Sequence, residues 1–157
     1  MKKLVLLAVA TLVVGLLLGC TAPAATTPST PTKILTLEMD SKGGANWDSD
    51  PEIDGIECYL QPRDFQGQLV SAPGTVSAQL WVVLSVVEST RKGELVQQWS
   101  GLQLKASDYD AASGARLRLE YRNYKPPDVQ YGILEVTLET SDGKRFTARL
   151  NSLILGD

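Results

Sequence analysis

Strict alternation of apolar and polar residues dominates the chain from residue 34 onward, and it restricts the fold more than any other feature. The segments RLRLEYR at 116–122 and LEVTLE at 134–139 both place every second side chain on one side of an extended chain. A period of two is typical of half-buried strands, which turn one set of side chains toward the core. No long segment shows helical spacing, so we expect an all-β domain.

Turn signals separate the alternating segments. Asp142-Gly143 lies between two of them and favours a hairpin, because glycine accepts a positive φ. We expect residues 107–114 to form a loop or a single helical turn, capped by Ser107 and ended by Gly114. The strands are predicted at 35–39, 56–61, 75–87, 94–99, 102–104, 116–122, 134–139 and 146–150. About seven antiparallel strands with such turns predict an immunoglobulin-like β-sandwich, with a small closed barrel as the alternative.

The predicted strand at 75–87 is the most apolar and has large side chains on both faces. We therefore expect it in the middle of a sheet. Trp81 and Val83 would lie on its outer face, where a loop of the same chain or a partner protein must cover them.

The first 20 residues have the pattern of a secretory leader. Lys2 and Lys3 precede an apolar run at 4–18, which is shorter than the ~20 residues of a membrane span and ends at Gly19-Cys20. The segment Leu17-Leu18-Gly19-Cys20 resembles the lipobox of bacterial lipoproteins. This resemblance implies a signal peptide at 1–19 and a diacylglyceryl thioether on Cys20. The alternative is an ordinary signal peptide followed by a chance cysteine.

A threonine- and proline-rich segment at 20–33 follows, with no large apolar side chain to build a core. We interpret it as a tether that reaches on the order of 40 Å when extended. Two or three acyl chains at Cys20 would hold the protein stably on a membrane. The expected location is the cell envelope, at the outer membrane where the organism has one, and the expected domain is 34–157.

Charge and residue content exclude several classes of function. When Lys2 and Lys3 leave with the leader, 13 of the 15 basic residues remain with all 18 acidic residues, a net charge of −5 that disfavours nucleic acid as a partner. The chain has no histidine, so it lacks Ser-His-Asp triads and His-paired cysteines. We therefore expect no enzymatic activity and no catalytic residue. Cys58 is expected as a buried, inert thiol.

The acidic segment at 48–55, DSDPEIDG, is the one local group with chemical content. Carboxylates at alternate positions converge when a chain curls, and Ca²⁺ prefers such oxygen ligands. The segment matches the first half of an EF-hand loop, but Gln61 stands where the bidentate glutamate belongs. A weak calcium site is one interpretation, and a turn built by Asp and Gly is the other. The candidate ligands are Asp48, Asp50, Glu52 and Asp54.

A binding or interaction module is the leading functional hypothesis, because sandwich loops often carry recognition on a rigid frame. Arg116 and Arg118 alternate with leucines and predict a solvated strand face paired with acids, or alternatively a docking patch for an acidic partner or polyanionic glycan. Aromatic residues that could stack on sugars or anchor an envelope protein are Trp47, Trp81, Trp99, Tyr109, Tyr124 and Tyr131. A structural accessory subunit of an envelope assembly is the other hypothesis.

The segment DGIECYLQPRDFQG at 54–67 is also similar to a stretch of bacterial envelope lipoproteins to which no activity is assigned. This second resemblance implies the same location as the lipobox. It implies no ligand.

Overall fold

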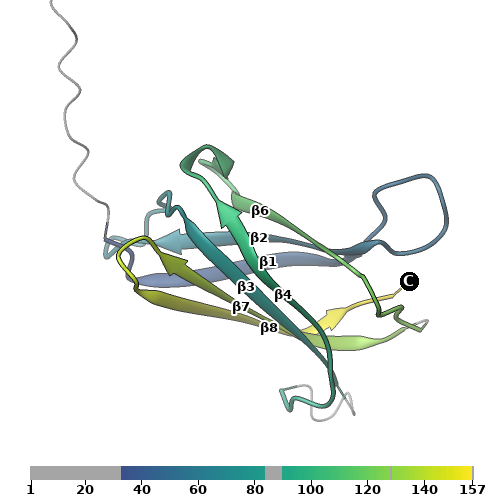
Figure 1. Cartoon of the computed structure of the whole chain (residues 1–157). Helices are drawn as coiled ribbons and strands as arrows, with labels where there is room; N and C mark the ends of the chain where they lie inside the picture. Colours follow the sequence, from purple (N-terminus) through teal and green to yellow (C-terminus); the bar gives the residue numbers. More distant parts are fainter. Residues whose placement is uncertain (1–32, 84–89, 128, 157) are drawn as a thin grey trace, which may run out of the picture. The chain divides into compact units, whose positions relative to one another are not determined.

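The computed structural model describes residues 33–83, 90–127 and 129–156, which form two stacked antiparallel sheets (Figure 1). The leader, Cys20 and the tether up to residue 32 lie outside the described residues. The first sheet has the order β1-β2-β6-β5, and the second has the order β4-β3-β7-β8. This arrangement confirms the predicted β-sandwich.

Seven of the eight strands overlap the predicted segments, and the eighth, Tyr109–Asp110, lies within residues 107–114, where a loop or a single helical turn was predicted. The first sheet contains β1 (Thr36–Ala45), β2 (Gly55–Arg63), β6 (Gly114–Glu120) and the short β5 (Tyr109–Asp110). The second sheet contains β4 (Leu95–Leu104), β3 (Gly74–Val82), β7 (Tyr131–Thr140) and β8 (Arg145–Ile154). With β4 lettered C′, the two orders become A-B-E-D and C′-C-F-G. These are the strand orders of immunoglobulin-like sandwiches.

Two local predictions need correction. The segments 94–99 and 102–104 are one strand, β4, which continues through Gly101 at φ +72°. Residues 106–108 form a 3-10 turn, η3 (Ala106–Asp108), in which Lys105 rather than Ser107 is the cap: the Asp108 carboxylate accepts from the Lys105 N–H at 2.8 Å. Strand β3 ends at Val82, and the rest of the predicted strand up to residue 87 lies largely outside the described residues.

The core lies between the sheets and is made of the inward sets that alternation predicts. Every second residue is buried from Ile56 to Pro62 in β2 and from Val76 to Leu80 in β3. Burial of each valine, leucine or isoleucine among them stabilises the fold by about 1.5–3 kcal/mol. Cys58 is one of the buried residues of β2. Large, fully buried side chains of this core include Ile56, Leu60, Leu80, Leu119, Leu134, Leu138 and Leu155.

Side chains of β4 connect the two sheets along one side of the sandwich. Gln97, which is 8% exposed, donates from Nε2 to the Glu120 carbonyl at 3.0 Å and accepts from the Arg122 N–H at 3.2 Å. The indole of Trp99 donates to the same Glu120 carbonyl at 2.8 Å. We call these three contacts the cross-sheet tie. They satisfy polar groups that would otherwise be buried without partners.

On the opposite side, β1 and the end of β8 pack closely. A Cβ atom at Gly44 would lie 2.5 Å from the Leu155 carbonyl oxygen, so only glycine allows this approach. The antiparallel register places the ends of β1, β3, β6 and β8 at one end of the sandwich, the loop end. Strand β1 begins at the other end, the tether end (Figure 1).

Trp81 and Val83 are covered within the fold, as one of the two predicted alternatives required. Val83 is buried, and the Lys92 ammonium lies 3.7 Å from the centroid of the half-buried Trp81 ring. Lys92 also pairs with Glu135 at 2.9 Å. The loop after β3 therefore supplies a cation over this ring.

Candidate functional site

The acidic loop at 46–54 is held by its own side chains. Asn46 Oδ1 accepts from the Asp48 N–H at 3.0 Å, Asp48 Oδ1 from the Asp50 N–H at 2.9 Å, and Asp50 Oδ1 from the Glu52 N–H at 2.8 Å. Each oxygen accepts from the amide two residues later, which is the Asx-turn pattern. The sequence interpretation of this segment as a turn therefore has a direct structural counterpart.

The two other candidate calcium ligands also have partners. The Asp54 carboxylate accepts from the Trp47 N–H, and Glu52 pairs with Lys125 of the loop after β6. Within the described residues, no three His, Cys, Asp or Glu side chains are grouped as metal ligands would be. Calcium binding by this loop stays a prediction, which a shift of the melting temperature in millimolar calcium tests.

The six candidate aromatic rings do not form one exposed platform. Trp99 is buried, and each of the other five is half-buried. Tyr109 donates to the Ala72 carbonyl at 2.7 Å, and Tyr124 packs edge-on against Tyr121 with ring centroids 5.4 Å apart. Trp47 and Trp81 lie on the outer faces of different sheets, over Gly55 and under Lys92 respectively. A flat sugar-stacking surface made of these rings is therefore not present.

Cys58 lies on the core face of β2 and is fully buried. Burial, with a smaller contribution from the negative charge of Glu57, raises the pKa of its thiol to about 12. A thiol in this state is a poor nucleophile. This surrounding matches the expected inert core residue.

The outer face of the first sheet carries an ordered ionic cluster, which we call the Arg–Glu–Tyr cluster: Glu57, Tyr59, Arg116 and Arg118. Glu57 stands opposite Arg118, and Tyr59 stands opposite Arg116, in the register of β2 with β6. Glu57 binds the Arg116 guanidinium, lies 3.9 Å from Arg118 Nε, and accepts from the Tyr59 hydroxyl at 2.8 Å. One carboxylate thus orients three side chains from two strands.

The exposure of this cluster is uneven. The Glu57 side chain is 17% exposed, whereas those of Arg116 and Arg118 are 49% and 53% exposed. The Arg116 hydrogen bond holds the pKa of Glu57 below its ordinary value, and the Glu57 hydrogen bond raises the pKa of Tyr59. The carboxylate is mostly covered while both guanidinium groups face water. The cluster is therefore a fixed cationic surface.

Trp47 extends this surface toward the loop end. The Arg118 guanidinium carbon lies 5.3 Å from the centroid of the Trp47 ring, within cation–π range. The ring fits against β2 because position 55 is glycine: a Cβ there would lie 2.8 Å from Trp47 and 2.3 Å from the Leu119 carbonyl oxygen. Trp47 therefore braces Arg118 from one side.

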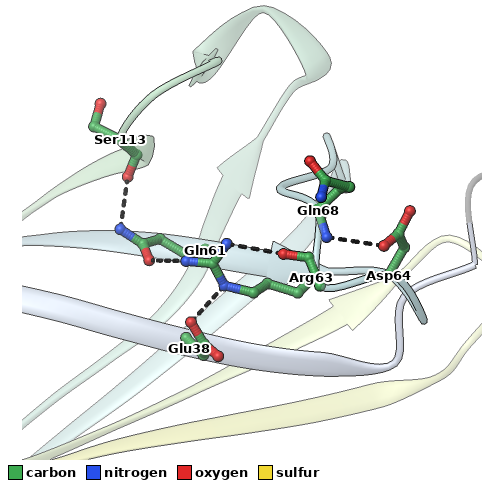
Figure 2. A network of polar contacts seen from close by, with 7 residues as sticks. Glu38, Gln61, Arg63, Asp64, Gln68 and Ser113 are labelled. Atoms are coloured by element: carbon green, nitrogen blue, oxygen red, sulfur yellow. Dashed lines mark hydrogen bonds and ion pairs between the residues drawn. The ribbon is translucent and has the colours of Figure 1, made fainter.

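A second polar network holds the same face at the tether end (Figure 2). Arg63 pairs with Glu38 of β1, donates to Gln61 Oε1 at 3.0 Å and donates to the Gly67 carbonyl at 3.1 Å. Gln61 in turn donates to the Ser113 carbonyl at 3.3 Å, as Figure 2 shows. The acids Glu38 and Asp40 lie on β1, and the arginines Arg116 and Arg118 lie on β6, so charge changes sign across the face.

Sequence reasoning found the arginines of this face but not their organising residue. Arg116 and Arg118 were predicted to face outward and to pair with acids, and they do. Glu57 gives no signal of its own, because its role depends on the pairing of β2 with β6. Of the other basic residues near this strand, Lys125 pairs with Glu52 of the acidic loop.

Comparison with known proteins gives no match among protein-family models, curated proteins or solved structures. Among the described residues there is also no helix of the length and apolar content that crossing a bilayer requires.

Proposed function

We propose that this chain is a lipid-anchored protein of the cell envelope whose β-sandwich binds a protein partner without catalysing a reaction. The anchor is Cys20, the tether is 20–33, and the binding module is 34–157. The observation that carries the binding proposal is the Arg–Glu–Tyr cluster, in which two arginines are positioned by one mostly covered carboxylate and remain open to water.

The cluster supports a protein partner more than a glycan. Side chains that are already ordered lose less conformational entropy when a partner binds them, and arginine forms paired hydrogen bonds with carboxylates. Carbohydrate recognition by stacked aromatic rings lacks an exposed set of rings, since none of the six candidate rings is exposed. An accessory role in a larger envelope assembly is the alternative, in which the same face would be a permanent subunit contact.

Crosslinking in intact cells followed by affinity capture tests the binding proposal. Replacing Arg116 and Arg118 by glutamine should abolish capture of a specific partner. Replacing Lys144 and Arg145 by glutamine removes the same charge from the other sheet, at side chains 60% and 72% exposed, and should leave capture intact. Equal capture by both variants would refute the role of the cluster. A stoichiometric complex that survives purification would favour the accessory-subunit alternative.

The anchor is tested separately by mass spectrometry of the mature amino terminus. A diacylglyceryl thioether on Cys20 is the expected result. An unmodified Cys20, or cleavage at another bond, would refute lipid attachment while leaving the binding face untouched.

A further inference from the structure

The first sheet has an open edge along β6. Strand β5 pairs with β6 only at Gly114 and Ala115. From Arg116 to Glu120, no strand within the described part of the chain pairs with β6 on the side away from β2. An unpaired edge presents backbone donors and acceptors to a further strand.

The backbone groups of Arg116 and Arg118 point toward this open edge. Tyr121 donates its N–H to the Asp54 carbonyl, on the β2 side, at 2.8 Å. Because successive residues of a strand direct their backbone groups to opposite sides, residues 116, 118 and 120 direct theirs away from β2. The Glu120 carbonyl confirms this direction, since it accepts from Gln97 and Trp99 of the other sheet.

Those contacts close the edge at the Glu120 carbonyl, as the pairing with β5 closes it up to the Arg116 N–H. The pairing of Tyr109 with Ala115 already engages the Arg116 N–H, because Ala115 itself faces β2. The Arg116 C=O and the N–H and C=O of Arg118 face the remaining open edge, where no strand of the described part of the chain pairs with them. The gap has the length of a short strand segment. It lies directly beside the two exposed guanidinium groups of the Arg–Glu–Tyr cluster.

The other sheet edges differ from this one. The pairing of β1 with β2 shifts between Ser41 and Gly43, that of β8 with β7 shifts between Gly132 and Leu134, and that of β4 with β3 shifts at two places. Such bulges twist an edge and hinder the addition of another strand. The pairing of β6 with β2 runs from Gly55–Glu120 to Leu60–Ala115 without a shift. The regular edge is thus the one that β5 leaves open.

We propose that the open edge of β6 binds an extended acidic segment of a partner protein, which adds a strand beside Arg116 and Arg118. This inference rests on the proposed binding function and specifies its mode. Backbone hydrogen bonds would supply affinity, and alternate side chains would supply specificity. Aspartate or glutamate at alternate positions of the added strand would stand beside Arg116 and Arg118 on the outer face.

Charge argues against a second copy of this chain as the occupant. Two β6 edges paired antiparallel about residue 117 would place Arg116 of one copy opposite Arg118 of the other, and like charges directly opposite each other destabilise a sheet. Pairing about residue 118 would still oppose the two Arg118 side chains, although it would place Arg116 opposite Glu120. The tether does not fit either, because residues 21–33 contain no acidic residue and contain three prolines, Pro23, Pro28 and Pro31.

The test uses the mature chain in detergent micelles and a peptide of about nine residues that alternates glutamate with threonine, long enough to span the open segment. Amide hydrogen exchange is measured with and without the peptide. We expect exchange at Arg118 to slow at least about tenfold, because its N–H becomes hydrogen-bonded. The amides of Arg116, Leu117 and Leu119 should change little, because the pairing with β5 or β2 already engages them. A peptide that alternates lysine with threonine is the matched control and should leave all four amides unchanged.

Substitutions separate the backbone from the side-chain contribution. Arg118→Gln removes the charge but keeps the N–H, whereas Arg118→Pro also removes the N–H at a position where a strand tolerates proline. The proline variant should bind the peptide at least about tenfold more weakly than the glutamine variant. If the proline variant fails to fold, the hydrogen-exchange measurement on the wild-type chain decides whether the peptide adds a strand.

Each alternative outcome has a distinct meaning. Binding without amide protection would overturn strand addition while leaving the face as a docking surface. Absence of binding by the acidic peptide would overturn the acidic specificity, and protection that appears on self-association would identify a second copy as the occupant. If one of these three outcomes occurs but the variant lacking both Arg116 and Arg118 still loses cellular capture, strand addition by an acidic segment is refuted and the proposed binding function is not.

Discussion

Replacing Gln97 by glutamate turns one hydrogen-bond donor of the cross-sheet tie into an acceptor without a change of shape. In the wild-type protein Gln97 Nε2 donates to the Glu120 carbonyl at 3.0 Å, and Gln97 Oε1 accepts from the Arg122 N–H at 3.2 Å. In the Gln97→Glu variant the second contact persists. The first becomes a carboxylate oxygen facing a carbonyl oxygen.

The expected loss of stability follows from these contacts. Removal of one hydrogen bond costs about 1 kcal/mol, and leaving a charged oxygen opposite an acceptor in a site only 8% exposed adds about 1–3 kcal/mol. The sum of about 2–4 kcal/mol is a large part of a typical unfolding free energy of about 5–15 kcal/mol. The Glu120 carbonyl keeps one donor in the variant, because the Trp99 indole still donates to it. The loss of stability is therefore smaller than it would be if this carbonyl had no partner.

The penalty should depend on pH with a defined sign. Repulsion from the Glu120 carbonyl raises the pKa of the new carboxyl in the folded state above the ordinary value of about 4.3. Below that value the group is protonated in both states and its O–H donates to Glu120, so the penalty is smallest there. It then grows as the pH rises toward the folded-state pKa.

Urea unfolding at about pH 4 and about pH 7.5 measures this effect, with ΔG extrapolated to water. Gln98→Glu is the matched control, because Gln98 is the next residue of β4, has the same chemistry and is exposed. The control should lose less than about 0.5 kcal/mol at both pH values. Equal losses in the two variants, or a Gln97→Glu penalty that grows as the pH falls, would refute the assigned role of the tie.

Three further predictions concern other parts of the fold. Carboxyl-carbon NMR titration should place the pKa of Glu57 below its ordinary value, so its stabilising contribution is present above the ordinary value and is lost as pH falls through the lowered pKa. Arg116→Gln should raise this pKa and Arg145→Gln should not, and an unchanged titration in the first variant would contradict the cluster. Gly55→Ala should lower the unfolding free energy by about 3 kcal/mol in thermal unfolding, because the new Cβ meets the Leu119 carbonyl oxygen. Gly101→Ala is the control: its Cβ meets open space, and its φ of +72° should cost about 1 kcal/mol from backbone strain alone. Similar losses in the two variants would contradict the close approach at Gly55. A thiol reagent should not react with the folded protein, because Cys58 is buried, and reaction in the folded state would contradict this burial. After unfolding, the reagent should count one thiol if Cys20 is acylated, and a count of two would contradict the acylation.

Burial could be predicted from the sequence wherever the local alternation of residues along a strand decides which side chains face the core. Ile56, Cys58 and Leu60 are buried as alternation predicted, since a strand beside a core offers each side chain only two directions. The sequence was less informative at β4, where the apolar positions change phase. Ala78 pairs with Trp99, but Val76 pairs with Leu102, and the extra residue is absorbed in a bulge next to Gly101. One strand therefore looked like two.

The site was predictable only in part, for the same physical reason. Outward arginines on β6 follow from local alternation, and the Asp-rich turn follows from local Asx chemistry. Glu57 is the shared partner of Arg116 and Arg118, which follow it in the chain by 59 and 61 positions, so only the pairing of β2 with β6 brings the three together. The burial of Gln97 likewise depends on the Glu120 carbonyl, which no local pattern indicates.

The position of β1 has a mechanical consequence. The chain enters the sandwich at the tether end, and β1 then runs beside β2 from the pair Thr36–Arg63 to the pair Ala45–Gly55. A pull on residue 33 against a load held at the loop end would act along this strand, while its hydrogen bonds lie across it. The ladder would then have to slide as a whole, and it could not open one rung at a time.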